Sequence, residues 1–246
     1  MNENTFHVSE KMKKDILELA EKHKENQDKF IRAIEKIIVP IEYQKKDLFL
    51  SVGNILYLSS NIRMAMTSWE HALKYLENKD GIKISVCYGN LGVVNYKLGN
   101  YNKAIDYYDK ALELFKEQRN KEGESICYMD LGAAEHHLYE FKKAAVFYKK
   151  AIKIFTELGN ESHESKGYVN LGDVYYGLGG FKKAIVYYEK ALKFFTGTGD
   201  KEGELKCYAR LGDVYEKMKN PEKAKEYKRK AENLNLNKFI KNNGIF

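Results

Sequence analysis

Few residues of this sequence stand in an arrangement that could do chemistry. Of its six histidines, only His136 and His137 are neighbours. Adjacent residues on a helix point about 100° apart, so one helix face cannot present both rings to a metal ion. No Gly-rich phosphate-binding loop follows an expected strand. We therefore predict no catalytic residues, no metal site and no cofactor, and we do not expect an enzyme.

The three cysteines, Cys87, Cys127 and Cys207, each precede a tyrosine and are separated by multiples of 40 residues. Equivalent atoms of stacked units lie farther apart than the ~7 Å that a disulfide allows. We therefore expect reduced, buried packing residues. The chain starts with polar residues and has no long apolar run, which predicts no signal peptide, no membrane contact and a cytoplasmic location.

The cysteine spacing is part of a longer repeat, first seen in Tyr88, Leu91-Gly92, Ala104, Tyr108 and Ala111. Steps of 40 residues give Tyr128, Leu131, Gly132, Ala144, Tyr148 and Ala151, then Tyr168, Leu171, Gly172, Ala184, Tyr188 and Ala191, then Tyr208, Leu211, Gly212, Ala224, Lys228 and Ala231; a backward step of 39 gives Phe49, Val52, Gly53, Ala65, Trp69 and Ala72. Within each copy, apolar residues spaced by three and four on both sides of a short breaker predict two helices. Five such copies predict a solenoid, because a two-helix unit must bury its apolar face on neighbouring units.

The order of an aromatic residue, Leu-Gly, Ala, a second aromatic and a second Ala resembles the tetratricopeptide repeat (TPR), over about residues 46–232. The usual TPR period is ~34 residues. We assign the extra residues to longer helix ends and to loops at 120–123, 159–160 and 199–200. The longer unit resembles the arrays of Pins-type G-protein modulators and, less closely, kinesin light chain, both of which are peptide-binding adaptors.

Gly92 lies inside a predicted helix, where glycine costs ~1 kcal/mol relative to alanine. A repeated cost of this kind needs a packing reason. We expect the two helices to approach closely at Gly92, with Ala104 as the small partner.

The resemblance implies an all-α fold, a right-handed α-solenoid (superhelix) of about five helix-turn-helix TPR units with an N-terminal helical cap. The predicted parts are a cap formed by a degenerate repeat (1–45), the array (46–234, with repeats at 46–84, 85–124, 125–164, 165–204 and 205–234) and a C-terminal tail (235–246). Leu236, Phe239 and Ile240 of the tail could cover the last apolar face. Alternatively, another chain completes that face, which would give homo-association.

In TPR arrays the first helix of each repeat lines the concave surface. Carried over by position, the resemblance predicts a peptide-binding groove formed by Tyr57, Asn90, Val93, Tyr96, Met129, Asp130, His136, Lys166, Asn170, Asp173, Tyr176, Lys206 and Arg210. Tyr57, Tyr96, His136 and Tyr176 recur in one position of the repeat. They predict either an aromatic ladder for a ligand or rings that pack against the next repeat.

Asn170, Lys206 and Arg210 resemble part of the clamp with which heat-shock-protein cochaperones bind a terminal carboxylate. That clamp also needs a Lys and an Asn, where this chain has Met129 and Ala133. Asp213 would partly oppose an anion. The favoured interpretation is that Asn90 and Asn170 bond to a peptide backbone.

The net charge is +7, and lysines concentrate on the predicted second helices. They form either a solvated outer face or a surface for an acidic partner or nucleic acid. Because no aromatic residues are expected between them on the exposed face, nucleic acid is the less favoured partner.

Together these features predict a non-catalytic scaffold or adaptor that binds a peptide segment of a partner protein in its concave groove. One alternative is a peptide-sensing regulatory module. The other is a protein that binds an acidic surface or nucleic acid through the basic convex face.

Overall fold

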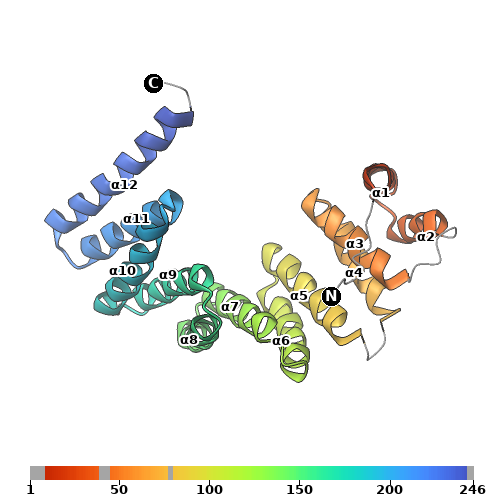
Figure 1. Cartoon of the computed structure of the whole chain (residues 1–246), viewed down its shortest axis with the longest axis horizontal. Helices are drawn as coiled ribbons and strands as arrows, with labels where there is room; N and C mark the ends of the chain where they lie inside the picture. The colour runs from red at the N-terminus through yellow and green to blue at the C-terminus, as the bar shows by residue number, and fades with distance from the viewer. Residues whose placement is uncertain (1–8, 39–44, 77–79, 243–246) are drawn as a thin grey trace. The chain divides into compact units, whose positions relative to one another are not determined.

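The computed structural model describes residues 9–38, 45–76 and 80–242, and within these ranges the regular elements are α-helices. The helices are α1 (Glu10–Lys22), α2 (Gln27–Ile38), α3 (Lys45–Leu58), α4 (Ile62–Leu73), α5 (Gly81–Lys97), α6 (Tyr101–Glu117), α7 (Lys121–His137), α8 (Phe141–Glu157), α9 (Glu161–Gly177), α10 (Phe181–Thr198), α11 (Lys201–Lys217) and α12 (Pro221–Asn242) (Figure 1). Consecutive helices pack as antiparallel pairs, which confirms the predicted all-α helical repeat fold. In the described part of the chain, no helix has the length and apolar character that a membrane crossing requires.

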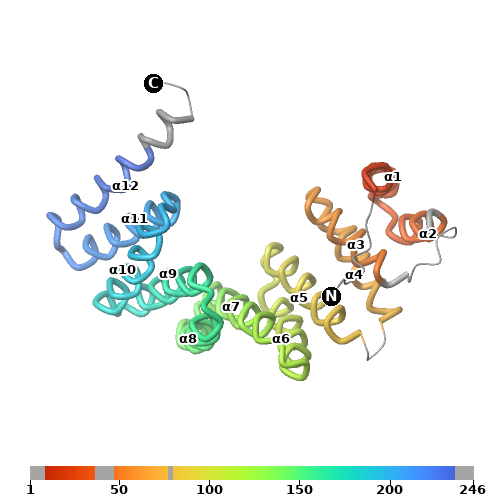
Figure 2. Tube along the Cα trace, in the orientation of Figure 1, coloured from red at the N-terminus to blue at the C-terminus, as the bar shows by residue number. Residues whose placement is uncertain are grey.

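The chain divides into two compact units, Met1–Asn120 and Lys121–Phe246. We call them the N-terminal unit, with α1–α6, and the C-terminal unit, with α7–α12; Figure 2 traces the first in red to yellow-green and the second in green to blue. In the N-terminal unit α1 packs on α3 and α2 packs on α4. Ile16 and Phe30 share one core with Leu48 and Phe49; the assignment of residues 1–45 as a cap stays a prediction.

The C-terminal unit consists of the pairs α7/α8, α9/α10 and α11/α12, and each second helix that has a following pair packs on the first helix of that pair. The first helices α7, α9 and α11 also contact one another in sequence. We call these three helices the first-helix row. Their side chains between the core positions form the surface on which the sequence predicts a ligand.

The 40-residue period comes from helix length. Helices α5 to α9 and α11 each have 17 residues. Turns of three residues separate the consecutive helices from α5 to α10, and a turn of two residues separates α10 from α11. The predicted loop at 120–123 is wrong, because α7 already begins at Lys121. The turns contain one residue in the left-handed region, which is Gly99 (φ 79°) after α5 but Tyr139 (φ 61°) after α7.

The repeated glycines make room for an aromatic ring. A Cβ atom added to Gly92 would lie 2.5 Å from Cε1 of Tyr108, a closer contact than real Cβ atoms make. Gly132 with Tyr148 and Gly172 with Tyr188 show the same arrangement. The nearest partner of Gly92 is therefore the ring of Tyr108 and not Ala104, which is fully buried. In the last repeat, where Lys228 replaces the ring, the backbone oxygen of Ala224, the counterpart of Ala104, lies 3.6 Å from the Cβ added to Gly212.

The three cysteines are buried and none of them forms a disulfide, as predicted. Burial raises the pKa of Cys87 and of Cys207 to about 12, so both thiols stay protonated. At the C-terminus, α12 continues beyond Leu234 to Asn242. The side chains of Leu236, Phe239 and Ile240 lie outside the described residues, and their capping role stays a prediction.

Candidate functional site

All the residues predicted to line the groove are half-buried or exposed, and none belongs to the core. They fall in both units, and each set is described by itself. The N-terminal unit holds Tyr57, Asn90, Val93 and Tyr96; the C-terminal unit holds Met129, Asp130, His136, Lys166, Asn170, Asp173, Tyr176, Lys206 and Arg210. Their assignment to a binding site stays a prediction.

In the N-terminal unit, Asn54 accepts two hydrogen bonds that join three helices. Its Oδ1 atom accepts from Nε1 of Trp69 at 3.2 Å and from Nδ2 of Asn90 at 3.3 Å. The indole N–H of Trp69, a residue that is 2% exposed, thereby has a hydrogen-bond partner within its own repeat. The side-chain amide of Asn90 already donates one hydrogen bond to Asn54 of the preceding repeat.

The C-terminal unit contains the same arrangement with charged residues. Oδ1 of Asp173 accepts a hydrogen bond from the Tyr188 hydroxyl at 2.7 Å and lies 3.0 Å from Nε of Arg210. Asp173 follows Gly172 as Asn54 follows Gly53, so the two acceptors occupy one position of the repeat. Burial and the Asp173 carboxylate raise the pKa of Tyr188, which keeps its hydroxyl a donor. In both units this acceptor links its own second helix to the first helix of the next repeat.

One repeat before Asp173, the acceptor position holds Ala133, whose methyl group cannot accept a hydrogen bond. Asn170, the residue that corresponds to Asn90 and Arg210, is half-buried, and its side chain makes no hydrogen bond with any described residue. Asp130, on the neighbouring helix α7, is also half-buried, and its side chain makes no hydrogen bond or ion pair within the described ranges. Burial raises the pKa of Asp130 to about 7. The first-helix row thus carries an amide and a carboxylate that lack partners.

His136 lies close enough to the charges of α9 and α11 to respond to them. Burial lowers its pKa, the Asp173 carboxylate raises it, and His137 and Arg210 lower it. The field of one polar cluster, His136, Asp173 and Arg210, therefore spans all three helices of the first-helix row.

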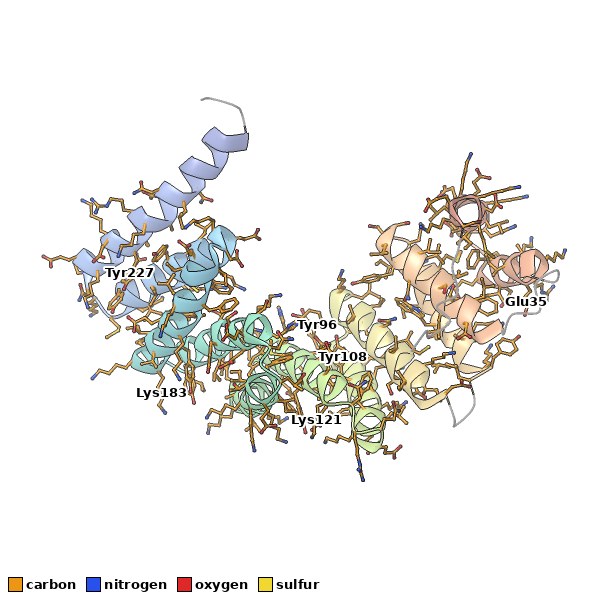
Figure 3. The ribbon with its side chains drawn as sticks, viewed as in Figure 1. Glu35, Tyr96, Tyr108, Lys121, Lys183 and Tyr227 are labelled. Carbon is orange, nitrogen blue, oxygen red and sulfur yellow. The ribbon has the colours of Figure 1, made fainter. Side chains whose placement is uncertain are left out.

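The recurring rings pack within their own repeats. The ring centroids of Tyr96 and Tyr101 are 5.5 Å apart, and Tyr96 is labelled on α5 in Figure 3. His136 with Phe141 (5.3 Å) and Tyr176 with Phe181 (5.7 Å) repeat this contact with the residue that begins the second helix. Tyr57 also contacts the next repeat, because Nζ of Lys97 lies 4.6 Å from its ring centroid. Packing against the next repeat and an aromatic ladder for a ligand both stay predictions.

The carboxylate clamp is not supported. Arg210 is already paired with Asp173, whereas Asp213 was the carboxylate expected to oppose the anion. Lys206 and Lys166 are exposed, and their side chains make no hydrogen bond or ion pair with the described residues.

Sequence reasoning missed a set of aromatic residues among the lysines of the second helices. The rings of Tyr175 and Tyr187 stack at 5.4 Å with an angle of 6°. Lys183 lies 5.2 Å above Tyr175, and Lys190 lies 5.7 Å from the Tyr187 centroid. The expectation that no aromatic rings are interleaved with these lysines is therefore wrong. The spacing of Tyr175 and Tyr215, 40 residues apart, was the available signal.

The family model described as Tetratricopeptide repeat matches residues 83–157 and 164–236, more than half of the chain. This chain belongs to the tetratricopeptide repeat family. Among curated proteins, none matches this TPR chain in sequence. The closer likeness to the Pins-type and kinesin light chain arrays stays an interpretation.

Several solved structures share the fold. BtubC (BKLC) from P. vanneervenii is 21% identical with a TM-score of 0.72, over 88% of this chain and 91% of that protein. The apo form of RapI is 18% identical with a TM-score of 0.67, over 90% of this chain and 97% of that protein. The STAND protein PH0952 from Pyrococcus horikoshii, which has a tetratricopeptide repeat sensor, is 24% identical with a TM-score of 0.70, over 93% of this chain and 35% of that protein. At these identities the likeness concerns the fold alone.

Proposed function

We propose that this TPR chain is a non-catalytic adaptor that binds a peptide segment of a partner protein along the first-helix row of its C-terminal unit. The observation that supports the proposal is that the side chains of Asn170 and Asp130, on neighbouring helices of that row, have no partner among the described residues. A partly desolvated polar group gains more from a hydrogen bond to a ligand than a fully solvated group does.

The chemistry of a peptide fits these two groups. The Asn170 amide can donate to a peptide carbonyl and accept from a peptide N–H, while Asp130 can accept from an N–H or a cationic side chain. Met129 and Ala133, both half-buried, supply apolar surface between them. A regulator that senses a short peptide would use the same surface.

The sharpest test supplies the missing acceptor. Ala133→Asn gives Asn170 the same partner that Asn54 gives Asn90, so we expect the fold to remain and the affinity for the partner to fall. Partners captured from a cell lysate are identified by mass spectrometry, and one purified partner fragment is then titrated against each variant. Asp130→Ala with Asn170→Ala should weaken the same complex by about tenfold or more.

Val146→Asn, an equivalent change at a residue of α8 that is 52% exposed, is the matched control and should bind as the unmodified chain does. Undiminished binding by both Ala133→Asn and the double alanine variant would overturn the proposal. A ligand that binds as a free short peptide would favour the sensing module over the adaptor.

A further inference from the structure

Two neighbouring hollows lie on the C-terminal unit, and none of the residues predicted for the peptide-binding groove lines either of them. One, of about 420 Å³, is lined by Lys149, Tyr175, Lys182, Lys183, Val186, Tyr187 and Lys190. The other, of about 590 Å³, shares Tyr175, Lys182 and Lys183 with it and adds apolar residues such as Leu178 and Met218. We call the two hollows together the Lys182 surface. Lys183, labelled in Figure 3, lies on α10 within it.

The positive charge of this surface is compensated only in part, since Lys190 also lines a further hollow, which contains Glu161 and Glu164. Its four lysines are exposed, no carboxylate lines either hollow, and none of the four makes an ion pair with any residue that the structure describes. Elsewhere in the same unit, Lys121 and Lys201 each pair with a glutamate at 2.7 Å. A cluster of exposed ammonium groups without counter-charges attracts an anionic partner.

The aromatic rings position these lysines and leave little room for stacking. Tyr187 stacks on Tyr175 at 5.4 Å and on Tyr168 at 6.1 Å. Lys149 and Lys183 lie 5.7 Å and 5.2 Å from the Tyr175 centroid. A hydrogen bond with Tyr175 raises the pKa of Lys149, which therefore stays charged. Because rings and ammonium groups already cover these faces, the surface lacks the open platforms on which nucleic-acid bases stack.

Apolar side chains lie among the charges. Val186 is 50% exposed, Leu178 is 43% exposed and Met218 is 38% exposed. A purely electrostatic ligand would leave these residues in water. A partner that brings both carboxylates and apolar side chains would satisfy the whole surface.

We propose that the Lys182 surface binds an acidic segment of a partner protein, in which carboxylates alternate with apolar side chains. The segment would contact the four lysines through its carboxylates and place its apolar side chains against Val186 and Leu178. This site uses residues other than those of the proposed groove, so either site can fail without the other.

The test uses the full chain and a fluorescein-labelled synthetic peptide rich in glutamate and leucine, titrated by fluorescence anisotropy. Lys182→Glu with Lys183→Glu should weaken binding by about tenfold or more, because it removes two attractions and adds two repulsions. Val186→Ser should weaken it severalfold. A peptide with serine in place of leucine should bind more weakly than the first peptide.

The matched control is Lys142→Glu with Lys153→Glu, which makes the same charge change at exposed positions of α8 and should alter affinity less than about twofold. An equal loss of affinity in this control would mean that the peptide responds to the total positive charge and not to the Lys182 surface, and it would overturn the proposal. Retention of duplex or single-stranded nucleic acid, without binding of either peptide, would overturn it too. Lys182→Gln with Lys183→Gln keeps the test available if charge reversal disturbs the fold.

Discussion

Arg210 on α11 points its Nε at Asp173 on α9, 3.0 Å from the carboxylate oxygen that also accepts the Tyr188 hydroxyl. The same three-helix contact in the N-terminal unit is made by neutral groups, with Asn90 and Trp69 donating to Asn54. A partly exposed ion pair contributes only about 0–1 kcal/mol to stability. Its main consequence is that the Arg210 guanidinium already has a partner, whereas the side chain of the corresponding Asn170, one repeat earlier, has none among the described residues.

This contact leads to a prediction for His136. Arg210→Gln removes a positive charge that lowers the pKa of His136 and leaves the Asp173 carboxylate, which raises it. We therefore expect the pKa of His136 to rise in the variant. Titration of the imidazole signals by NMR measures the change, and an unaltered titration would contradict the proximity of these three helices.

Asp130 predicts an unusual dependence of stability on pH. Burial raises its pKa from 3.8 to about 7, so between these values the folded state holds a proton that the unfolded state has lost. The free energy of unfolding should therefore fall as pH rises from about 4 to about 7, and the loss is complete above that range. Asp130→Asn removes the effect and should be more stable than the unmodified chain by about 1–4 kcal/mol at pH 8, with little difference at pH 4.

Urea unfolding at both pH values measures this difference. A constant difference between the two proteins across the range would argue that Asp130 is solvated. A ligand that donates to Asp130 favours the ionised form, so its affinity should increase as pH rises through 7.

The glycine contacts predict opposite effects of one substitution in two repeats. Gly172→Ala places a methyl group 2.5 Å from the ring of Tyr188 and should lower the free energy of unfolding by about 1–3 kcal/mol. Gly212→Ala meets the flexible Lys228 side chain, whose Cγ is 3.0 Å away, and should be neutral or stabilising by up to about 1 kcal/mol. Denaturant unfolding compares the two variants, and equal losses would show that the ring is not the cause.

The turns offer a stabilising change. Lys219 has φ 56°, a conformation that costs a residue with a Cβ about 1–2 kcal/mol. Lys219→Gly should therefore increase stability by about 0.5–1 kcal/mol, after the greater freedom of glycine in the unfolded chain is deducted. Gly179→Ala, at a φ of 71°, makes the reverse change and should lower the melting temperature. A fall in the melting temperature of Lys219→Gly would contradict the prediction.

The repeat, its two helices and its buried residues could be predicted from the sequence, because a packed position selects similar residue types in most copies. Gly92, Tyr108 and Cys87 recur with their copies for that reason. The aromatic partner of the glycine could not be predicted, since spacing along the chain does not say whether Ala104 or Tyr108 crosses the first helix at that point.

Sequence alone determined that helices of near-equal length stack in order, since hydrophobic periodicity is a local property that recurs in each copy. Only the tertiary structure decided which polar side chains already have partners. Asn90 and Arg210 each take a partner from the preceding repeat, whereas Ala133 offers none to the Asn170 side chain, so the residues at positions 54, 133 and 173 determine their state. Hydrogen bonds require atoms within about 3 Å, and only the packing of one repeat on the next brings those atoms together.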